Sequence, residues 1–152
     1  MMRRRKAREL ALQGLYALDV SGNSMEAALR DLSAWSSDEE VVNFAADIIR
    51  KAEAHRETLD QDVARAADNW KYERIALVDR LILRIALCEL LYFEDIPPKV
   101  TINEAIDLAK KYSTAESGRF VNGMLDALLK KYNDEKRIRK KGRGLLDVKA
   151  ES

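Results

Sequence analysis

The feature that most constrains the fold is one long apolar stretch, "LVDRLILRIALCELLYF", at residues 77–93. After residue 80 its only charged residues are Arg84 and Glu89. Apolar side chains on nearly every side of a helix require other helices around it. We expect this central helix to begin near Tyr72 and to end at Ile96-Pro97-Pro98, because a residue that precedes proline is pushed out of the helical region. The stretch therefore predicts an all-α fold.

Further helices are predicted on both sides of this stretch. An N-terminal helix is ended by Ser21-Gly22-Asn23, and a short helix follows from about Met25 to Ala34. A capping box of Ser37 with Glu40 then begins a helix that reaches about Asp68, with a bend near residues 55–58. Two more capping boxes, Thr101 with Glu104 and Ser113 with Glu116, predict the starts of the last two helices. We find no strand pattern and no internal repeat.

The stretch "GRFVNGMLDALL" at residues 118–129 contains two conflicting signals. Asn122-Gly123 is typical of a hairpin turn. The flanking apolar residues, however, recur every three to four positions, which favours a helix. A glycine inside a helix costs about 1 kcal/mol relative to alanine. The presence of Gly123 inside a helix therefore needs a structural or functional explanation.

The net charge of +1 hides a segregated distribution. Residues 1–8 carry five basic side chains and no acidic one, and residues 130–143 carry eight basic and two acidic ones. Between them, residues 9–129 carry 13 basic and 22 acidic side chains. An acidic body with basic ends predicts a polyanionic partner, most simply nucleic acid. The alternative is that the basic ends only keep the protein soluble.

The sequence offers little for catalysis or metal binding. The single histidine, His55, has no metal-ligand neighbours at suitable spacing, and the single cysteine, Cys88, lies in the apolar stretch, where we expect it to be buried and inert. Neither a phosphate-binding glycine loop nor a nucleophile motif occurs. We therefore predict a protein that is not an enzyme and has no cofactor or metal. Without a signal peptide or a membrane-spanning stretch, we expect it to be soluble and cytoplasmic.

The basic N-terminus has the composition of a site for single-stranded RNA. Its cations are followed by an amide and an aromatic ring, and the candidate residues are Arg3, Arg4, Arg5, Lys6, Arg8, Gln13 and Tyr16. Cations bind phosphates, an amide can bind a base edge, and a tyrosine ring offers a stacking surface. The alternative is that Gln13 is solvated and Tyr16 belongs to the core.

Two segments resemble the NusB family of bacterial transcription antitermination factors. They are "RRRKARELALQGLYALD" near the N-terminus and "DRLILRIALCELLYFEDIPPKVTINEAIDLAKKYSTAESGRFVNGMLD" in the second half. Both occur in the family's order and at about its separation, whereas residues 22–70 are less diagnostic. The resemblance implies about seven helices in two packed helical subdomains around the central apolar helix. We expect one domain at 1–135, with N-terminal helices to about residue 70 and C-terminal helices from 71, and a basic, disordered tail at 136–152.

The resemblance also implies a function. NusB proteins pair with the ribosomal protein NusE, bind single-stranded boxA RNA and join the RNA polymerase elongation complex, which supports transcription of ribosomal RNA operons. The implied RNA-binding residues are Arg3, Arg4, Arg5, Arg8, Gln13 and Tyr16 near the N-terminus, with Glu116, Arg119 and Phe120 as a second patch. The implied NusE-facing residues are Asp79 and Arg84, which could instead be paired internally. Gly123 would allow another helix to approach closely, so that Tyr16 and Phe120 share one surface, and Asn122 would be a buried, satisfied amide or face the RNA.

Two alternatives have different functions. A purely structural helical adaptor would bind RNA without sequence preference. A helical module of this kind also occurs at the N-terminus of certain ribosomal RNA cytosine methyltransferases, but this sequence holds no cofactor-binding α/β domain. The free protein could be a monomer or a homodimer.

Overall fold

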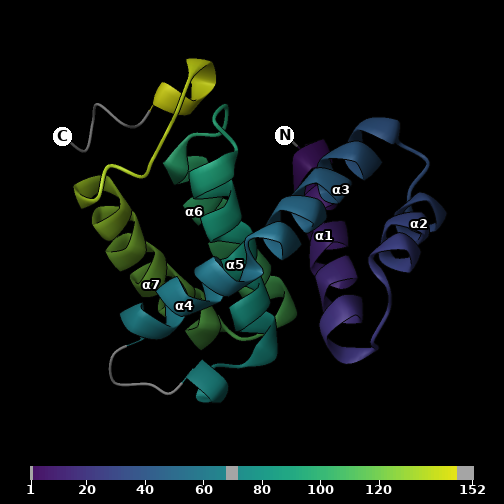
Figure 1. The fold of residues 1–152 in the computed structure, drawn as a ribbon, viewed down its shortest axis with the longest axis horizontal. Coiled ribbons are helices and arrows are strands. Elements are labelled where there is room, and N and C mark those ends of the chain that lie inside the picture. Colours follow the sequence, from purple (N-terminus) through teal and green to yellow (C-terminus); the bar gives the residue numbers. More distant parts are fainter. Residues whose placement is uncertain (1, 68–71, 147–152) are drawn as a thin grey trace. The chain divides into compact units, whose positions relative to one another are not determined.

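The computed structural model describes residues 2–67 and 72–146, and within them the chain is helical (Figure 1). The α-helices are α1 (Met2–Val20), α2 (Met25–Trp35), α3 (Glu39–Ala54), α4 (Arg56–Ala66), α5 (Leu77–Tyr92), α6 (Pro98–Tyr112) and α7 (Ala115–Asp134). Two short 3₁₀ helices, η1 (Tyr72–Arg74) and η2 (Gly142–Leu145), complete the set. No strand occurs in the described residues, and the predicted all-α fold of about seven helices is confirmed. Asp68 lies outside the described residues.

The chain divides into two compact units, Met1–Ala54 and His55–Ser152. The division falls where α3 gives way to α4, at the bend that the sequence predicts near residues 55–58. It lies before the expected boundary near residue 70, because α4 packs on α5 and α7.

The first unit is a three-helix assembly in which α1 packs against both α2 and α3. Its core is formed by buried aliphatic residues, among them Leu10, Leu15, Leu32 and Ile48. Gly14 lies where α1 meets α3, and a Cβ atom there would stand 2.6 Å from Cδ1 of the buried Ile49. The close approach of these two helices therefore depends on a glycine in α1.

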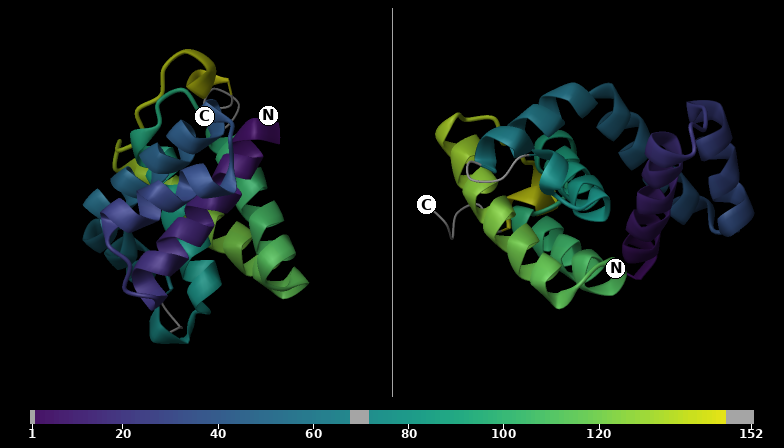
Figure 2. Two further views of the ribbon diagram at one scale, coloured as in Figure 1. Left: turned by 90° about the vertical axis from the view of Figure 1, so that its right-hand side faces the viewer. Right: turned by 90° about the horizontal axis from the view of Figure 1, so that it is seen from below.

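The second unit is built around α5, as the apolar stretch predicts. Helices α4, α6 and α7 all pack on α5, and α6 and α7 also pack on each other (Figures 1 and 2). Every residue of α5 from Leu81 to Leu91 is buried. The helix ends at Tyr92, earlier than expected, and Pro98 does not end it but occupies the first position of α6. Proline is favoured there because that position's N–H has no partner within the helix.

Two of the three predicted capping boxes lie next to the residues that cap the helices in the structure. The helix after residue 37 is capped by Asp38, whose carboxylate accepts from the N–H groups of Glu40 and Val41. Thr114, rather than Ser113, caps α7 by accepting from the N–H of Ser117 at 3.0 Å. These two caps are therefore one residue away from the predicted ones.

The third box is wrong, because Thr101 and Glu104 lie inside α6 and are both buried. The hydroxyl of Thr101 donates to the carboxylate of Glu89 at 2.9 Å, which satisfies a buried acid on α5. A spacing of three residues places two side chains on one helix face, so a buried polar pair can imitate a capping box.

The packing role expected for Gly123 is also wrong, and so is the buried position for Asn122, whereas its alternative role of facing RNA stays a prediction. Both residues are exposed on α7, and a Cβ atom at Gly123 would have nothing within 4 Å among the described residues. The glycine that α7 uses for packing is Gly118, whose Cβ would lie 3.0 Å from Cγ of Lys110 on α6. Neither a close helix crossing nor a buried amide accounts for Asn122-Gly123.

Gly14 on α1 and Gly123 on α7 make a matched pair of sites for substitution. We expect Gly123→Ala to raise the free energy of unfolding by about 0.5–1 kcal/mol, because alanine has the higher helix propensity and the site has room. Gly14→Ala gains the same propensity but forces Ile49 aside, so we expect a net loss of about 1 kcal/mol. Urea unfolding followed by circular dichroism measures both. Equal effects of the two substitutions would contradict the packing assigned to Gly14.

Residues 136–146, which we expected to be disordered, follow a defined path along the second unit. The chain turns at Lys136, whose φ is 57°, and returns from the end of α7 to the C-terminal end of α5 (Figure 1). There the N–H of Lys141 donates to the carbonyl of Glu94 at 2.9 Å. We call residues 136–146 the C-terminal strap.

Candidate nucleic-acid interface

The basic N-terminus forms the first two turns of α1, and its cations are not equivalent. Arg3, Arg4, Arg5 and Lys6 are exposed. Arg3 makes ion pairs with Asp38 at 3.1 Å and Glu40 at 2.7 Å, both near the start of α3. Ion pairs as exposed as these contribute little to stability, so RNA phosphates can compete for the guanidinium.

Arg8 differs from the expectation that it binds RNA. Only 3% of its surface is exposed, and its guanidinium lies 5.6 Å from the centre of the Phe44 ring. Arg4 lies over the same ring at 4.6 Å. In this structure Arg8 packs inside the protein, whereas Arg4 combines contact with Phe44 and access to solvent.

An exposed stripe runs along α1 beyond the basic turns. Lys6, Gln13, Tyr16 and Val20 are all exposed, Tyr16 to 44%. They are separated by seven, three and four residues, which places them on one side of a helix. A cation, an amide and an aromatic ring therefore share one surface, and the alternative that Tyr16 is a core residue does not hold.

The second predicted patch lies at the start of α7. Glu116 and Arg119 are exposed, and Phe120 is half-buried. The exposed side of α7 continues through Asn122 and Gly123. Since the two patches belong to different compact units, each is described on its own.

The residues assigned to the NusE surface, Asp79 and Arg84, are buried in the second unit. Arg84, with 2% of its surface exposed, donates from Nε and Nη2 to the two carboxylate oxygens of Asp60 on α4, at 3.0 and 3.1 Å. Asp79, with 6% exposed, accepts from the hydroxyl of Ser117 on α7 at 3.0 Å. Arg84 is therefore paired internally, whereas Asp79 has this hydroxyl as its hydrogen-bond donor, and its other oxygen, the buried Oδ1, has no hydrogen-bond partner among the described residues.

The described residues contain no metal-binding cluster. None of their histidine, cysteine and acidic side chains form a group that could hold a metal ion, and Cys88 is buried, as expected. His55 is partly buried and stacks on Tyr92 with ring centres 3.9 Å apart. No helix in the described part of the chain is both long and apolar enough to span a membrane.

The protein is all-helical in its described residues, and its N-terminal helix carries exposed basic and polar side chains. Comparison with known families shows which protein family has this fold and this helix. The NusB family's sequence model matches residues 5–130. The chain belongs to the NusB family, as the sequence motifs predict. Proteins of this family are non-catalytic transcription antitermination factors, in agreement with the prediction that the chain is not an enzyme.

Relatives and solved structures agree with this assignment. The transcription antitermination protein NusB of Salinibacter ruber is 44% identical over 97% of this chain and 94% of its own length. The structure of T. maritima NusB is similar with a TM-score of 0.78 and 33% identity, covering 88% of this chain and 95% of that one. NusB solved with NusE and double-stranded RNA is similar with a TM-score of 0.75 and 27% identity, covering 87% and 99%.

Proposed function

We propose that this chain is an RNA-binding antitermination factor that pairs with NusE and recognises single-stranded boxA-type RNA. Through that complex it acts on the RNA polymerase elongation complex and supports transcription of ribosomal RNA operons in the cytoplasm. The similarity to NusB solved with NusE and double-stranded RNA supports pairing with NusE and binding to RNA, and the choice of single-stranded RNA rests on the exposed side chains of α1. Family membership supports the role in antitermination.

The observation that carries the proposal is the exposed stripe on α1. Lys6 supplies a cation for phosphate, Gln13 an amide for a base edge and Tyr16 a ring for stacking, all on one side of one helix. Bases are accessible to such side chains only when the RNA is unpaired, which favours single-stranded RNA over a regular duplex. The exposed arginines at positions 3–5 extend the stripe with positive charge.

The second patch contributes from α7. Arg119 offers a further cation and Phe120 a half-buried ring at the surface, with Glu116 beside them. A carboxylate can accept a hydrogen bond from a base amino group. We assign Glu116 to base recognition and Arg119 to phosphate binding.

A titration of labelled RNA tests the proposal. The wild-type protein is titrated into a boxA RNA and into a scrambled RNA of equal length, each with and without NusE. The proposal expects tighter binding of the boxA RNA, with the larger preference when NusE is present. Equal affinity for both RNAs under both conditions would instead support the structural adaptor.

Tyr16→Ala is expected to lower the affinity for boxA RNA by about 1–3 kcal/mol, because one stacking surface for a base is lost. The melting temperature is expected to change little, since the ring is 44% exposed. Tyr112→Ala is the matched control, because it removes a tyrosine exposed to 41% at the end of α6. Equal losses of RNA affinity in both variants would contradict the role of Tyr16.

A further inference from the structure

The C-terminal strap is basic, but its cations fall into two groups with different surroundings. Arg137 and Lys140 point into the second unit, whereas Lys136, Arg139, Lys141 and Arg143 are exposed. The inward pair fixes the strap in place. The outward set therefore projects from an ordered backbone rather than from a mobile tail.

The inward pair makes specific contacts with three helices. Arg137 donates from Nη2 to Asp62 on α4 at 3.1 Å, and its guanidinium lies 4.4 Å from the centre of the Tyr132 ring on α7. The hydroxyl of Tyr132 donates to the same carboxylate at 2.6 Å. Burial and the Asp62 carboxylate raise the pKa of Tyr132, so this hydroxyl keeps its proton. One acid on α4 thus holds α7 and the strap together.

The other anchor, Lys140, caps the C-terminal end of α5. Its Nζ donates to the carbonyls of Glu89 at 3.0 Å and Phe93 at 2.8 Å. Both carbonyls also accept from backbone N–H groups, those of Phe93 and Ile96, and the negative end of the helix dipole attracts a cation there. Burial lowers the pKa of Lys140 to about 8. Further along, Gly144 lies so close to the Glu94 carbonyl that a Cβ atom there would clash with it.

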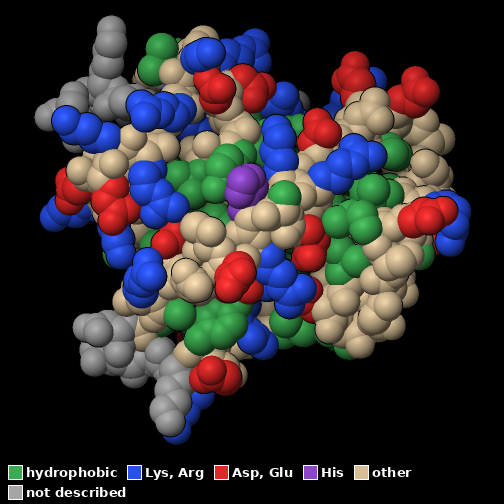
Figure 3. Space-filling model, viewed as in Figure 1, with side chains coloured by type: hydrophobic (Ala, Val, Ile, Leu, Met, Phe, Trp, Pro, Cys, Tyr) green, Lys and Arg blue, Asp and Glu red, His purple; other side chains and the backbone are tan. Residues whose placement is uncertain are grey.

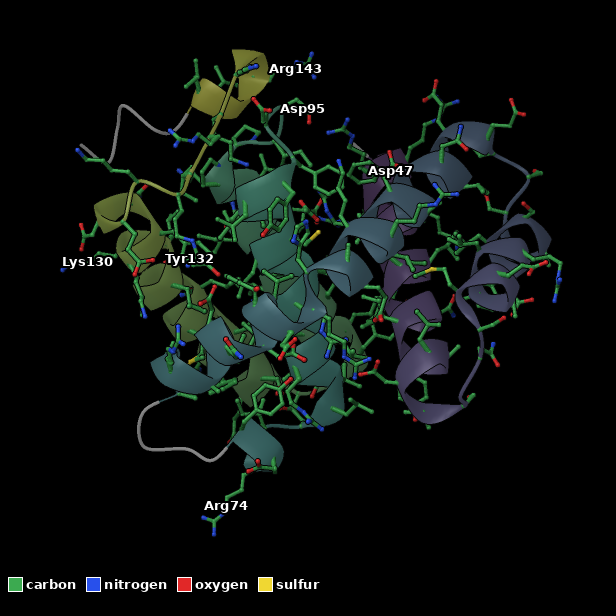
Figure 4. The ribbon with its side chains drawn as sticks, viewed as in Figure 1. Asp47, Arg74, Asp95, Lys130, Tyr132 and Arg143 are labelled. Atoms are coloured by element: carbon green, nitrogen blue, oxygen red, sulfur yellow. The ribbon has the colours of Figure 1, made fainter. Side chains whose placement is uncertain are left out.

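The outward cations are poorly matched by acids. Within the described part of the chain, Lys136, Arg139 and Arg143 have no acidic partner, and neither does Lys130 on α7. Lys141 makes an exposed ion pair with Glu94 at 3.4 Å. Lys and Arg side chains gather where the strap crosses the second unit (Figure 3), and Lys130 and Arg143 mark two ends of this region (Figure 4).

We infer that the strap is a second RNA-binding surface, which holds the sugar-phosphate backbone of single-stranded RNA without reading its sequence. Its outward cations are two or three residues apart in sequence, so successive cations are at most about 7–10 Å apart along the backbone. The strap presents no aromatic ring for stacking on a base. Cations alone bind phosphates and position the RNA, whereas specificity requires contacts with bases.

This inference rests on the proposed function in taking RNA as the polyanion, and it adds a site outside residues 5–130, where the family's sequence model matches. The α1 stripe would select the RNA sequence, and the strap would add contacts with RNA phosphates that do not depend on sequence. These contacts increase the salt dependence of the affinity.

The test measures binding of single-stranded oligouridine, which contains no boxA element, as a function of salt concentration. The variant is Arg139→Gln with Arg143→Gln, which removes two outward cations and keeps the anchors Arg137 and Lys140. The matched control is Arg30→Gln with Arg74→Gln, two exposed arginines that are not part of the strap. Arg74 lies on η1, and Figure 4 shows it at the opposite end of the second unit from Arg143.

The strap variant is expected to reduce the slope of log affinity against log salt by about 1.4, at about 0.7 for each lost phosphate contact. At 0.1 M salt the affinity for oligouridine then falls by up to about 25-fold. The control is expected to keep the wild-type slope, and both variants to keep the wild-type melting temperature. An unchanged slope in the strap variant, an equal reduction in the control, or no oligouridine binding by the wild type would overturn the inference.

Failure of the proposed function is a separate outcome. A wild-type protein that does not prefer boxA RNA over scrambled RNA contradicts sequence recognition, but the oligouridine slopes still decide the role of the strap. If the protein prefers boxA RNA but the salt slope for oligouridine is unchanged in the strap variant, only the RNA-binding role of the strap is contradicted.

Discussion

Replacing Asp79 with lysine is expected to lower the free energy of unfolding by about 3–5 kcal/mol. The carboxylate is 6% exposed and accepts a hydrogen bond from Ser117 on α7, so it joins α5 to α7 inside the second unit. A lysine would place a longer side chain and an unpaired cation in that space. Urea unfolding followed by circular dichroism gives the change, and a NusE titration of the folded variant gives the binding.

Asp126→Lys is the control for this prediction, because it makes the same charge reversal at an exposed position of α7. Its effect on stability is expected to stay within about 0.5 kcal/mol. If Asp79→Lys instead melts near the wild-type temperature and binds NusE weakly, Asp79 is a partner-facing residue, as the family resemblance implies.

Asp60→Ala is expected to destabilise the protein by about 3 kcal/mol, because it leaves the buried guanidinium of Arg84 without its acid. The loss is expected at the lower end of the range for broken buried pairs, because the Asp60 side chain is 23% exposed to solvent. Thermal and urea unfolding measure it. Glu57→Ala, an exposed acid on the same helix, is the control and is expected to change stability by less than about 0.5 kcal/mol.

A second substitution makes the test of this ion pair sharper. Adding Arg84→Met to Asp60→Ala removes both charges and fills part of the space with an apolar side chain. The double variant is expected to recover part of the lost stability, because the buried cation has gone. If the two losses simply add, Asp60 and Arg84 do not act as a pair.

The sequence predicts the helices well because their signals are local. The apolar stretch in α5 can only be the interior of a helical protein, and Ser21-Gly22-Asn23 ends α1 in the structure as predicted, with Gly22 at a φ of 68°. Caps are predicted less well, because Ser, Thr and Asp side chains all accept from helix N–H groups and neighbouring candidates compete. Asp38 and Thr114 are the residues that form these bonds.

Contacts between distant residues account for what the sequence does not predict. The spacing of Thr101 and Glu104 is the same for a cap and for a buried pair, and only the position of Glu89 on a neighbouring helix distinguishes them. In the same way, Gly14, Gly118 and Gly123 are all glycines inside helices, but the first two have a neighbouring side chain close by and the third has none among the described residues. The hydropathy pattern around a glycine does not contain that information.

In the candidate interface, too, features set by local sequence are predicted and features set by contacts between distant residues are not. The exposed stripe on α1 follows from helix periodicity, whereas the burial of Arg8, Asp79 and Arg84 depends on packing partners. The strap was expected to be disordered because its composition is polar and charged. Two of its cations instead find buried acceptors, Asp62 and the last carbonyls of α5.

The anchoring of the strap has a consequence for how the second unit folds. Arg137 meets Asp62 across 75 residues of chain, and Lys140 meets Glu89 across 51. Contacts between such distant residues form slowly, because a long loop must close first. During synthesis, moreover, the strap leaves the ribosome after all seven α-helices. The contact of Lys140 with the end of α5 therefore forms only after α7 and the strap have been synthesised, and it is expected to be among the last steps in the folding of the second unit.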